Sequence, residues 1–135
     1  MKLSNNFTLQ EMCASATAEA NDITNAPTAE QIANLQSLCL RLLQPLRTSY
    51  GEAFHINSGF RSLALNKAVG GVPTSQHLRG QAADVRVRQP RKLLAKLLET
   101  ELDFDQAILY PTFLHLSYNE NDNRQQVLYA KGVKP

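Results

Sequence analysis

The sequence contains no tryptophan, only two cysteines and no long run of apolar residues. Cys13 and Cys39 lie far apart and outside any Cys-x-x-Cys pair, so we expect two free buried thiols rather than a disulfide framework. Nothing approaches the roughly 20 apolar residues of a membrane-spanning helix, so we expect no membrane partner. The first residues, MKLSNNFTLQEM, lack the apolar core of a signal peptide. We therefore expect a soluble chain that no cleaved signal exports.

An excess of charge of one sign is also missing. Lys and Arg number 14 and Asp and Glu number 12, and the net charge of +2 is too small to indicate a nucleic-acid partner. The one basic stretch, RVRQPRKLLAK at residues 86–96, is interpreted as a solvated helix face. Hydrophobic residues make up 43% of the 135 residues, which is typical of a globular chain with its own core. We expect one domain over residues 1–135, present as a monomer.

Helical periodicity is strongest in the first half of the chain and just after residue 90. Thr28 caps a long helix in which apolar residues recur every three or four positions as far as residue 46. Pro45 is expected to kink this helix or to mark a break near its end. A second amphipathic helix is predicted from Pro90 to about residue 102, with four inward leucines: Leu93, Leu94, Leu97 and Leu98.

Strand signals gather in the second half of the chain. Alternating or β-rich stretches occur at residues 53–57, 82–88, 104–110, 112–118 and 125–131. The polar stretch NENDN, residues 119–123, is expected to be the turn of a hairpin between the last two. Helices first and strands mostly later predict an α+β fold, with N-terminal helices packed on a small antiparallel sheet.

Two of the three histidines lie where metal ligands could be presented. His77 is in the loop SQHLRGQAADV (residues 75–85), Asp84 begins a strand, and His115 lies on another strand. Three protein ligands with one open position are typical of a catalytic zinc site. On spacing alone the competing interpretation is three unrelated residues, because ligands this far apart in sequence are weak evidence. His55 has no partner at a suitable spacing and is interpreted as a surface or supporting histidine.

Four segments together resemble one known family. They are SGFRS (58–62), LNKAVGG (65–71), SQHLRGQAADV (75–85) and FLHLSY (113–118). The chain resembles the zinc D-alanyl-D-alanine carboxypeptidases, a family of the hedgehog/DD-peptidase fold that includes phage L-alanyl-D-glutamate endopeptidases. The family pattern S-x-H-x-x-G-x-A-x-D is matched at every fixed position, by Ser75, His77, Gly80, Ala82 and Asp84.

The resemblance implies a function and a set of roles. His77, Asp84 and His115 would be the ligands of a Zn²⁺ ion, and Arg61 and Ser75 would bind the substrate or its oxyanion. The implied activity is hydrolysis of peptide bonds in peptidoglycan stem peptides, as a carboxypeptidase or an endolysin-type endopeptidase of the cell wall. Such a protein would wait in the cytoplasm until released, or would be exported by a non-classical route.

The sequence departs from the family at the general base. Many relatives have a glutamate three residues before the last histidine, where this chain has Thr112. Closer relatives have a strand resembling DQLIYE, and here DQAILYP places Leu109 or Tyr110 near that glutamate. Asp105 and Tyr110 are the candidate bases, on opposite faces of a strand, and Asp105 is preferred because a carboxylate is the better base at pH 7. A competing hypothesis is a catalytically weak or inactive wall-binding module of the same fold.

Overall fold

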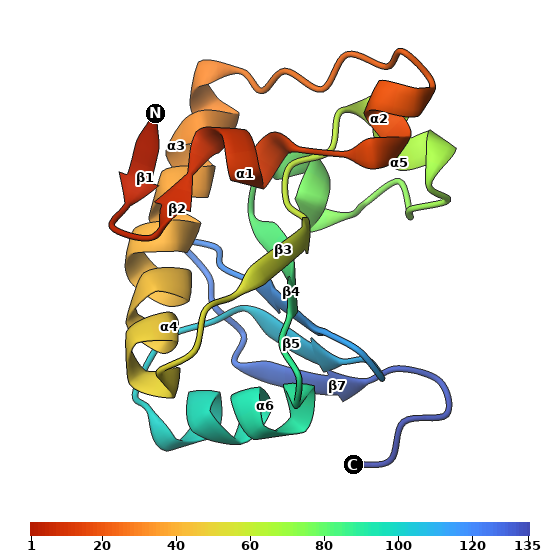
Figure 1. Cartoon of the computed structure of the whole chain (residues 1–135). Helices are drawn as coiled ribbons and strands as arrows, with labels where there is room; N and C mark the ends of the chain where they lie inside the picture. The colour runs from red at the N-terminus through yellow and green to blue at the C-terminus, as the bar shows by residue number, and fades with distance from the viewer.

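The computed structural model describes all residues from 1 to 135 and contains two sheets and six α-helices (Figure 1). The smaller sheet is the pair β1 (Lys2–Ser4) and β2 (Phe7–Thr8), and the larger one has the order β3–β4–β6–β5–β7. Its strands are β3 (His55–Ser58), β4 (Ala82–Arg86), β5 (Gln106–Leu109), β6 (Leu114–Ser117) and β7 (Gln126–Tyr129). The helices are α1 (Leu9–Cys13), α2 (Ala16–Ala20), α3 (Ala29–Leu38), α4 (Gln44–Tyr50), α5 (Leu63–Ala68) and α6 (Pro90–Glu99).

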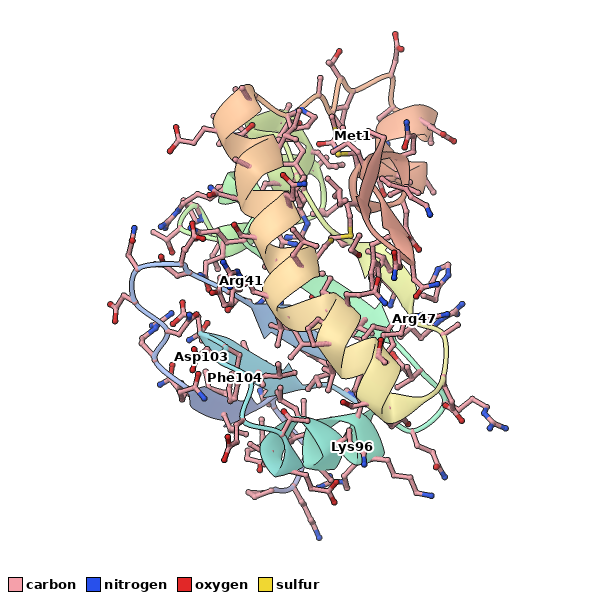
Figure 2. The ribbon with its side chains drawn as sticks, turned by 90° about the vertical axis from the view of Figure 1, so that its left-hand side faces the viewer. Met1, Arg41, Arg47, Lys96, Asp103 and Phe104 are labelled. Atoms are coloured by element: carbon pink, nitrogen blue, oxygen red, sulfur yellow. The ribbon has the colours of Figure 1, made fainter.

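One continuous helical rod, formed by α3 and α4, crosses the large sheet in Figure 2. It begins at a capping box in which Thr28 and Gln31 bond each other's backbone N–H groups, as the sequence predicts for its start. Pro45 does not end the rod, but the regular α-helix is interrupted just before it, as expected for a proline near the end of a helix. A π-helical turn, Cys39–Leu43, precedes it, so the N–H of Gln44 bonds the carbonyl of Cys39 five residues back and the helix runs on to Tyr50. The wider turn accommodates a residue that has no N–H and crowds the turn before it.

The hydrophobic core lies between this rod, α6 and one face of the large sheet. Alternate residues of the central strands are buried on that face: Ala83, Val85, Ala107, Leu109, Leu114 and Leu116. From α6, Leu93, Leu94 and Leu97 join the core, as predicted. Leu98 does not; it is 55% exposed, because one residue turns the helix by about 100° and carries it beyond the buried stripe. The opposite face of the sheet is therefore left for polar groups.

The last strand corrects the expected topology. β7 does not form a hairpin with β6; it pairs in parallel with β5, so the sheet is mixed rather than purely antiparallel. Residues 118–125 instead cross to the far side of β5. The N–H groups of Gln125 and Gln126 bond the carbonyls of Phe104 and Asp105, which fixes this crossover to the start of β5. The polar composition of residues 119–123 indicated a connection, but it carried no information on which strand β7 pairs with.

Two N-terminal features were not predicted. β1 and β2, of three and two residues, are too short to show strand periodicity, and no element was predicted for residues 16–20, which form α2. The two cysteines are free, with Cys39 buried and Cys13 partly buried, as expected. None of the helices has the length and apolar character needed to span a bilayer.

Candidate metal centre

The polar face of the large sheet presents Asp84 and His115 side by side. Asp84 on β4 pairs in register with His115 on β6, and His115 in turn pairs with Ile108 on β5. Because side chains alternate along a strand, these residues point away from the core that Ala83 and Leu116 enter. The carboxylate and the imidazole are thereby held on adjacent strands without any loop having to place them.

His77 reaches the same point from a short 3₁₀ turn, Gln76–Arg79, that follows the cleft wall. Ser75 caps this turn, since its Oγ accepts the N–H of His77 at 3.2 Å. The turn ends at Gly80, which has φ +75° and whose missing Cβ would lie 2.6 Å from the carbonyl oxygen of Gln31. Gln31 also donates to the carbonyl of Leu78, so α3 holds the turn from behind. A side chain at residue 80 would therefore collide with the backbone of α3 and disturb the turn that carries His77.

The three side chains converge with their potential ligand atoms within 4.8 Å of one another. Asp84 Oδ1 lies 2.8 Å from His115 Nδ1 and 3.4 Å from His77 Nε2. The other nitrogen of His77, Nδ1, lies 2.6 Å from the carbonyl oxygen of Gly59 and donates to it, which directs the lone pair of Nε2 into the cluster. Two imidazole nitrogens and a carboxylate oxygen meeting at one point fit a divalent metal ion such as zinc.

The cluster carries a negative charge on Asp84, as a site for a cation requires. Burial alone would raise the pKa of the Asp84 carboxyl, but the hydrogen bond with His115 and the proximity of His77 hold it well below its usual range. Asp84 is therefore a carboxylate with both histidines around it. No other group of three or more His, Cys, Asp or Glu residues in the chain converges in this way.

Arg61 lies beside the cluster, where the family resemblance implies it. Its Nη2 is 3.7 Å from Asp84 Oδ2, its Nε donates to Ser58 Oγ at 3.0 Å, and its Nη1 donates to Asn66 Oδ1 at 3.2 Å. Burial lowers the pKa of Arg61, whereas the nearby Asp84 and Tyr110 oppose that change, and arginine stays charged at neutral pH. A fixed positive charge therefore stands next to the ligands.

These groups open into a cleft of about 850 Å³. Ser75 and Tyr110 both line it, and the ring of Tyr110 stacks on Phe113 with centroids 4.4 Å apart. Leu109, the other residue near the position of the family's glutamate, is 2% exposed and belongs to the core. Of the two, only Tyr110 faces the cleft.

Asp105 also borders the cleft, so the prediction that it and Tyr110 lie on opposite faces is wrong: Asp105 precedes β5, whose regular alternation begins at Gln106. Its carboxylate is nevertheless engaged elsewhere. Its oxygens accept bonds from Gln76 Nε2 at 2.9 Å and from the backbone N, Nε and Nη2 of Arg124 at 3.0, 2.7 and 3.0 Å. These bonds, led by that of the Arg124 side chain, lower the pKa of Asp105. The carboxylate thus ties the turn that carries His77 to the crossover before β7.

Three of the supporting residues were not singled out from the sequence. Gln76 and Arg124 surround Asp105, and Asn66 holds Arg61. The only available signal was for Asn66, an amide inside the apolar helix of LNKAVGG, where a polar residue needs a partner. His55 is exposed on β3 and touches none of these groups, in agreement with its interpretation as a surface histidine.

No curated protein matches the chain. A sequence model of the peptidase M15 family matches residues 5–117, a region that contains Arg61 and all three converging ligand residues. Because this match covers most of the chain, the protein belongs to the peptidase M15 family of metallopeptidases.

Proposed function

We propose that this protein is a zinc-dependent peptidase that hydrolyses peptide bonds in peptidoglycan stem peptides. The observation that carries the proposal is the convergence of His77 Nε2, Asp84 Oδ1 and His115 Nδ1 at an open cleft, with Arg61 alongside. Three protein ligands leave a coordination position for a reactant, as in catalytic rather than structural zinc sites. A zinc ion held there would lower the pKa of a water to about 7 and polarise the scissile carbonyl.

The protein's own contribution is charge and hydrogen bonding around the reacting carbonyl. The cleft-facing edge of Arg61 can stabilise negative charge that develops on the carbonyl oxygen, or bind a substrate carboxylate. The Oγ of Ser75 accepts the N–H of His77, so its own O–H can donate to the peptide. Both roles follow the family resemblance and remain part of the proposal.

Peptide hydrolysis also needs a group that accepts a proton from the attacking water. Asp105 and Tyr110 are the two candidates, and the four bonds that Asp105 already accepts leave it poorly suited to take a proton from the attacking water. We therefore favour Tyr110, on the cleft face two residues beyond Ile108, the strand partner of His115. A tyrosine hydroxyl is a poorer general base at neutral pH than a carboxylate, because only its phenolate form can accept a proton, so turnover is expected to be slow.

This observation also favours a second candidate function. Asp84 belongs to the ligand cluster and Asp105 is paired with Arg124, so neither is free as a base beside the ligands. Asp122, the third carboxylate that lines the cleft, is exposed on the crossover before β7 and is no part of the ligand cluster. A protein of this kind could bind stem peptides in the cleft without cutting them. The same fold would then serve as a wall-binding module.

One experiment separates the two functions. Metal content of the purified protein is measured, and purified peptidoglycan is incubated with the protein, with D84N and with metal-chelated protein; released peptides are identified by mass spectrometry. The peptidase proposal expects one zinc per chain and products that appear only with the zinc-loaded wild type. Zinc-loaded protein that sediments with peptidoglycan and releases nothing would support the binding module instead. The masses of the products would show whether the enzyme removes a terminal residue or cuts internally.

A further inference from the structure

Asn66 is a buried amide, 1% exposed, that the proposed mechanism does not use. It lies in α5, and its side chain joins two parts of the cleft. Its Oδ1 accepts a hydrogen bond from Arg61 Nη1 at 3.2 Å, and its Nδ2 donates to the carbonyl of Val72 at 2.9 Å. Its backbone carbonyl accepts the N–H of Gly71 at 2.8 Å. One residue thereby contacts both the cleft arginine and the loop that follows α5.

That loop packs directly on the contact between Asn66 and Arg61. A Cβ on Gly71 would lie 2.1 Å from Asn66 Oδ1 and 3.0 Å from Arg61 Nη1, so the backbone passes over the pair with no space for a side chain. Residues 70–72 and 74 line the cleft, and Val72 is 62% exposed there. The cleft wall at residues 70–74 therefore depends on Asn66 for its position.

Two hydrogen bonds set the orientation of the Arg61 guanidinium. Its Nε donates to Ser58 and its Nη1 to Asn66, while its Nη2 lies on the side of Asp84 Oδ2. Because a guanidinium is planar, two bonds at different nitrogens fix both its plane and its rotation. With the Asn66 bond removed, only the Ser58 bond and the longer contact of Nη2 with Asp84 Oδ2, at 3.7 Å, would restrain the group.

We propose that Asn66 is a positioning residue of this site, which presents the guanidinium of Arg61 to the cleft and holds the wall at residues 70–74 against it. Asn66 touches neither the ligand cluster nor the reacting groups, so its effect reaches the chemistry only through Arg61 and the wall. The effect of Asn66 on turnover rests on the proposed function, whereas its effect on the orientation of Arg61 does not. A misplaced charge beside a reacting carbonyl stabilises the transition state less well, so we expect N66A to lower kcat/KM by about tenfold.

The first test needs neither metal nor activity. In ¹⁵N-labelled metal-free protein, the Nε–H signal of Arg61 is assigned by its loss in R61K and its exchange with solvent is measured. We expect a sharp, slowly exchanging signal in the wild type and a broadened or fast-exchanging one in N66A. N66D keeps an acceptor for Arg61, so its signal should remain sharp. An unchanged Arg61 signal in N66A would overturn the proposal. Loss of the signal in folded N66D would overturn it as well, and the N66D result decides the question if N66A does not fold.

The second test is a double-mutant cycle on peptide hydrolysis. If Asn66 acts through Arg61, N66A should reduce kcat/KM by a clearly larger factor in the wild-type background than in the R61A background, where only its effect on the wall remains. N21A is the control, because the exposed side chain of Asn21 bonds only the carbonyl of Thr17 in α2 and does not touch Arg61. Its effect should be the same factor in both backgrounds.

An equal loss for N66A in the two backgrounds would overturn the positioning role. If the wild type hydrolyses nothing, the proposed function fails, and the Arg61 signal alone decides the role of Asn66.

Discussion

His77 Nδ1 lies 2.6 Å from the carbonyl oxygen of Gly59, and this contact decides which nitrogen of His77 faces the metal site. An imidazole that donates from Nδ1 carries its lone pair on Nε2, the atom that points at Asp84. The carbonyl is itself held in place, because Gly59 packs against the backbone of Met12 and the next N–H, of Phe60, bonds the carbonyl of Met12. The orientation of a ligand on the 3₁₀ turn is thus set by the end of α1.

Substitution of Gly59 should therefore weaken metal binding from outside the ligand set. A Cβ there would lie 2.3 Å from the carbonyl oxygen of Met12, so in G59A the segment must shift and carry the acceptor of His77 with it. We expect zinc affinity to fall about 10- to 100-fold, the usual effect of losing such a partner. Competition with a chromogenic chelator measures it. G132A is the control for backbone strain away from the cleft, because residue 132 has φ +85° but open space around the Cβ and should not affect zinc affinity. Unchanged affinity in folded G59A would contradict the orienting role.

Zinc should stabilise the fold only when its ligands are intact. Binding to the native state alone adds about 2.7 kcal/mol to the free energy of unfolding when free zinc is 100 times the Kd. H77A and H115A should each lose most of this increment, measured by denaturant unfolding with and without zinc. H55A, at the exposed histidine of β3, should keep all of it. Zinc-dependent stabilisation that survives in H77A would place the metal elsewhere.

The residue at position 110 should control turnover. Y110E introduces a carboxylate on the cleft face near the position of the family's glutamate, and general-base catalysis typically contributes about 10²- to 10⁴-fold. We expect Y110E to hydrolyse stem peptides faster than the wild type, and Y110F to be slower because it removes the hydroxyl. Initial rates at pH 7 on one synthetic stem peptide compare them. If all three proteins are equally active, the base is not at this position.

Removal of Arg61 should reduce turnover without loss of the metal. In R61A the ligand residues keep their own backbone positions on β4, β6 and the 3₁₀ turn, so zinc content should stay at one per chain. The loss of one oxyanion-type donor typically costs about 10²- to 10³-fold in turnover. R88A, at an arginine whose side chain is 89% exposed, is the charge-matched control. Full activity in R61A would assign the arginine a purely structural role.

The ion pair of Asp105 with Arg124 should stabilise the folded protein, and this stabilisation should depend on pH. Its folded-state pKa is lowered, so its stabilising effect is complete above the usual aspartate pKa of about 4 and is lost as the pH falls below it. D105N should lower the free energy of unfolding by about 1–3 kcal/mol at pH 7, and by progressively less below pH 4. Urea unfolding of both proteins across this range measures the difference. D103N, at an exposed neighbour, should show no such change, and a pH-independent gap for D105N would contradict the ion-pair role.

The sequence by itself determined the local features of this protein. Helix caps, the leucine stripe and strand alternation depend on neighbouring residues, so Thr28, Pro90 and the strand around Asp84 were located correctly. The motif segments also indicated the ligand set, and the convergence of His77, Asp84 and His115 agrees with it.

Only the tertiary structure decided the features that depend on pairs distant in sequence. The parallel pairing of β7 with β5 depends on contacts between the 118–125 crossover and the start of β5, which no local pattern records. The same holds for Asp105, whose partner Arg124 is 19 residues away, and for Asn66, whose amide meets Arg61 only once α5 is folded over the cleft. A carboxylate in a sequence can be a base, a ligand or an ion-pair partner, because its role is set by the groups that folding brings to its oxygens.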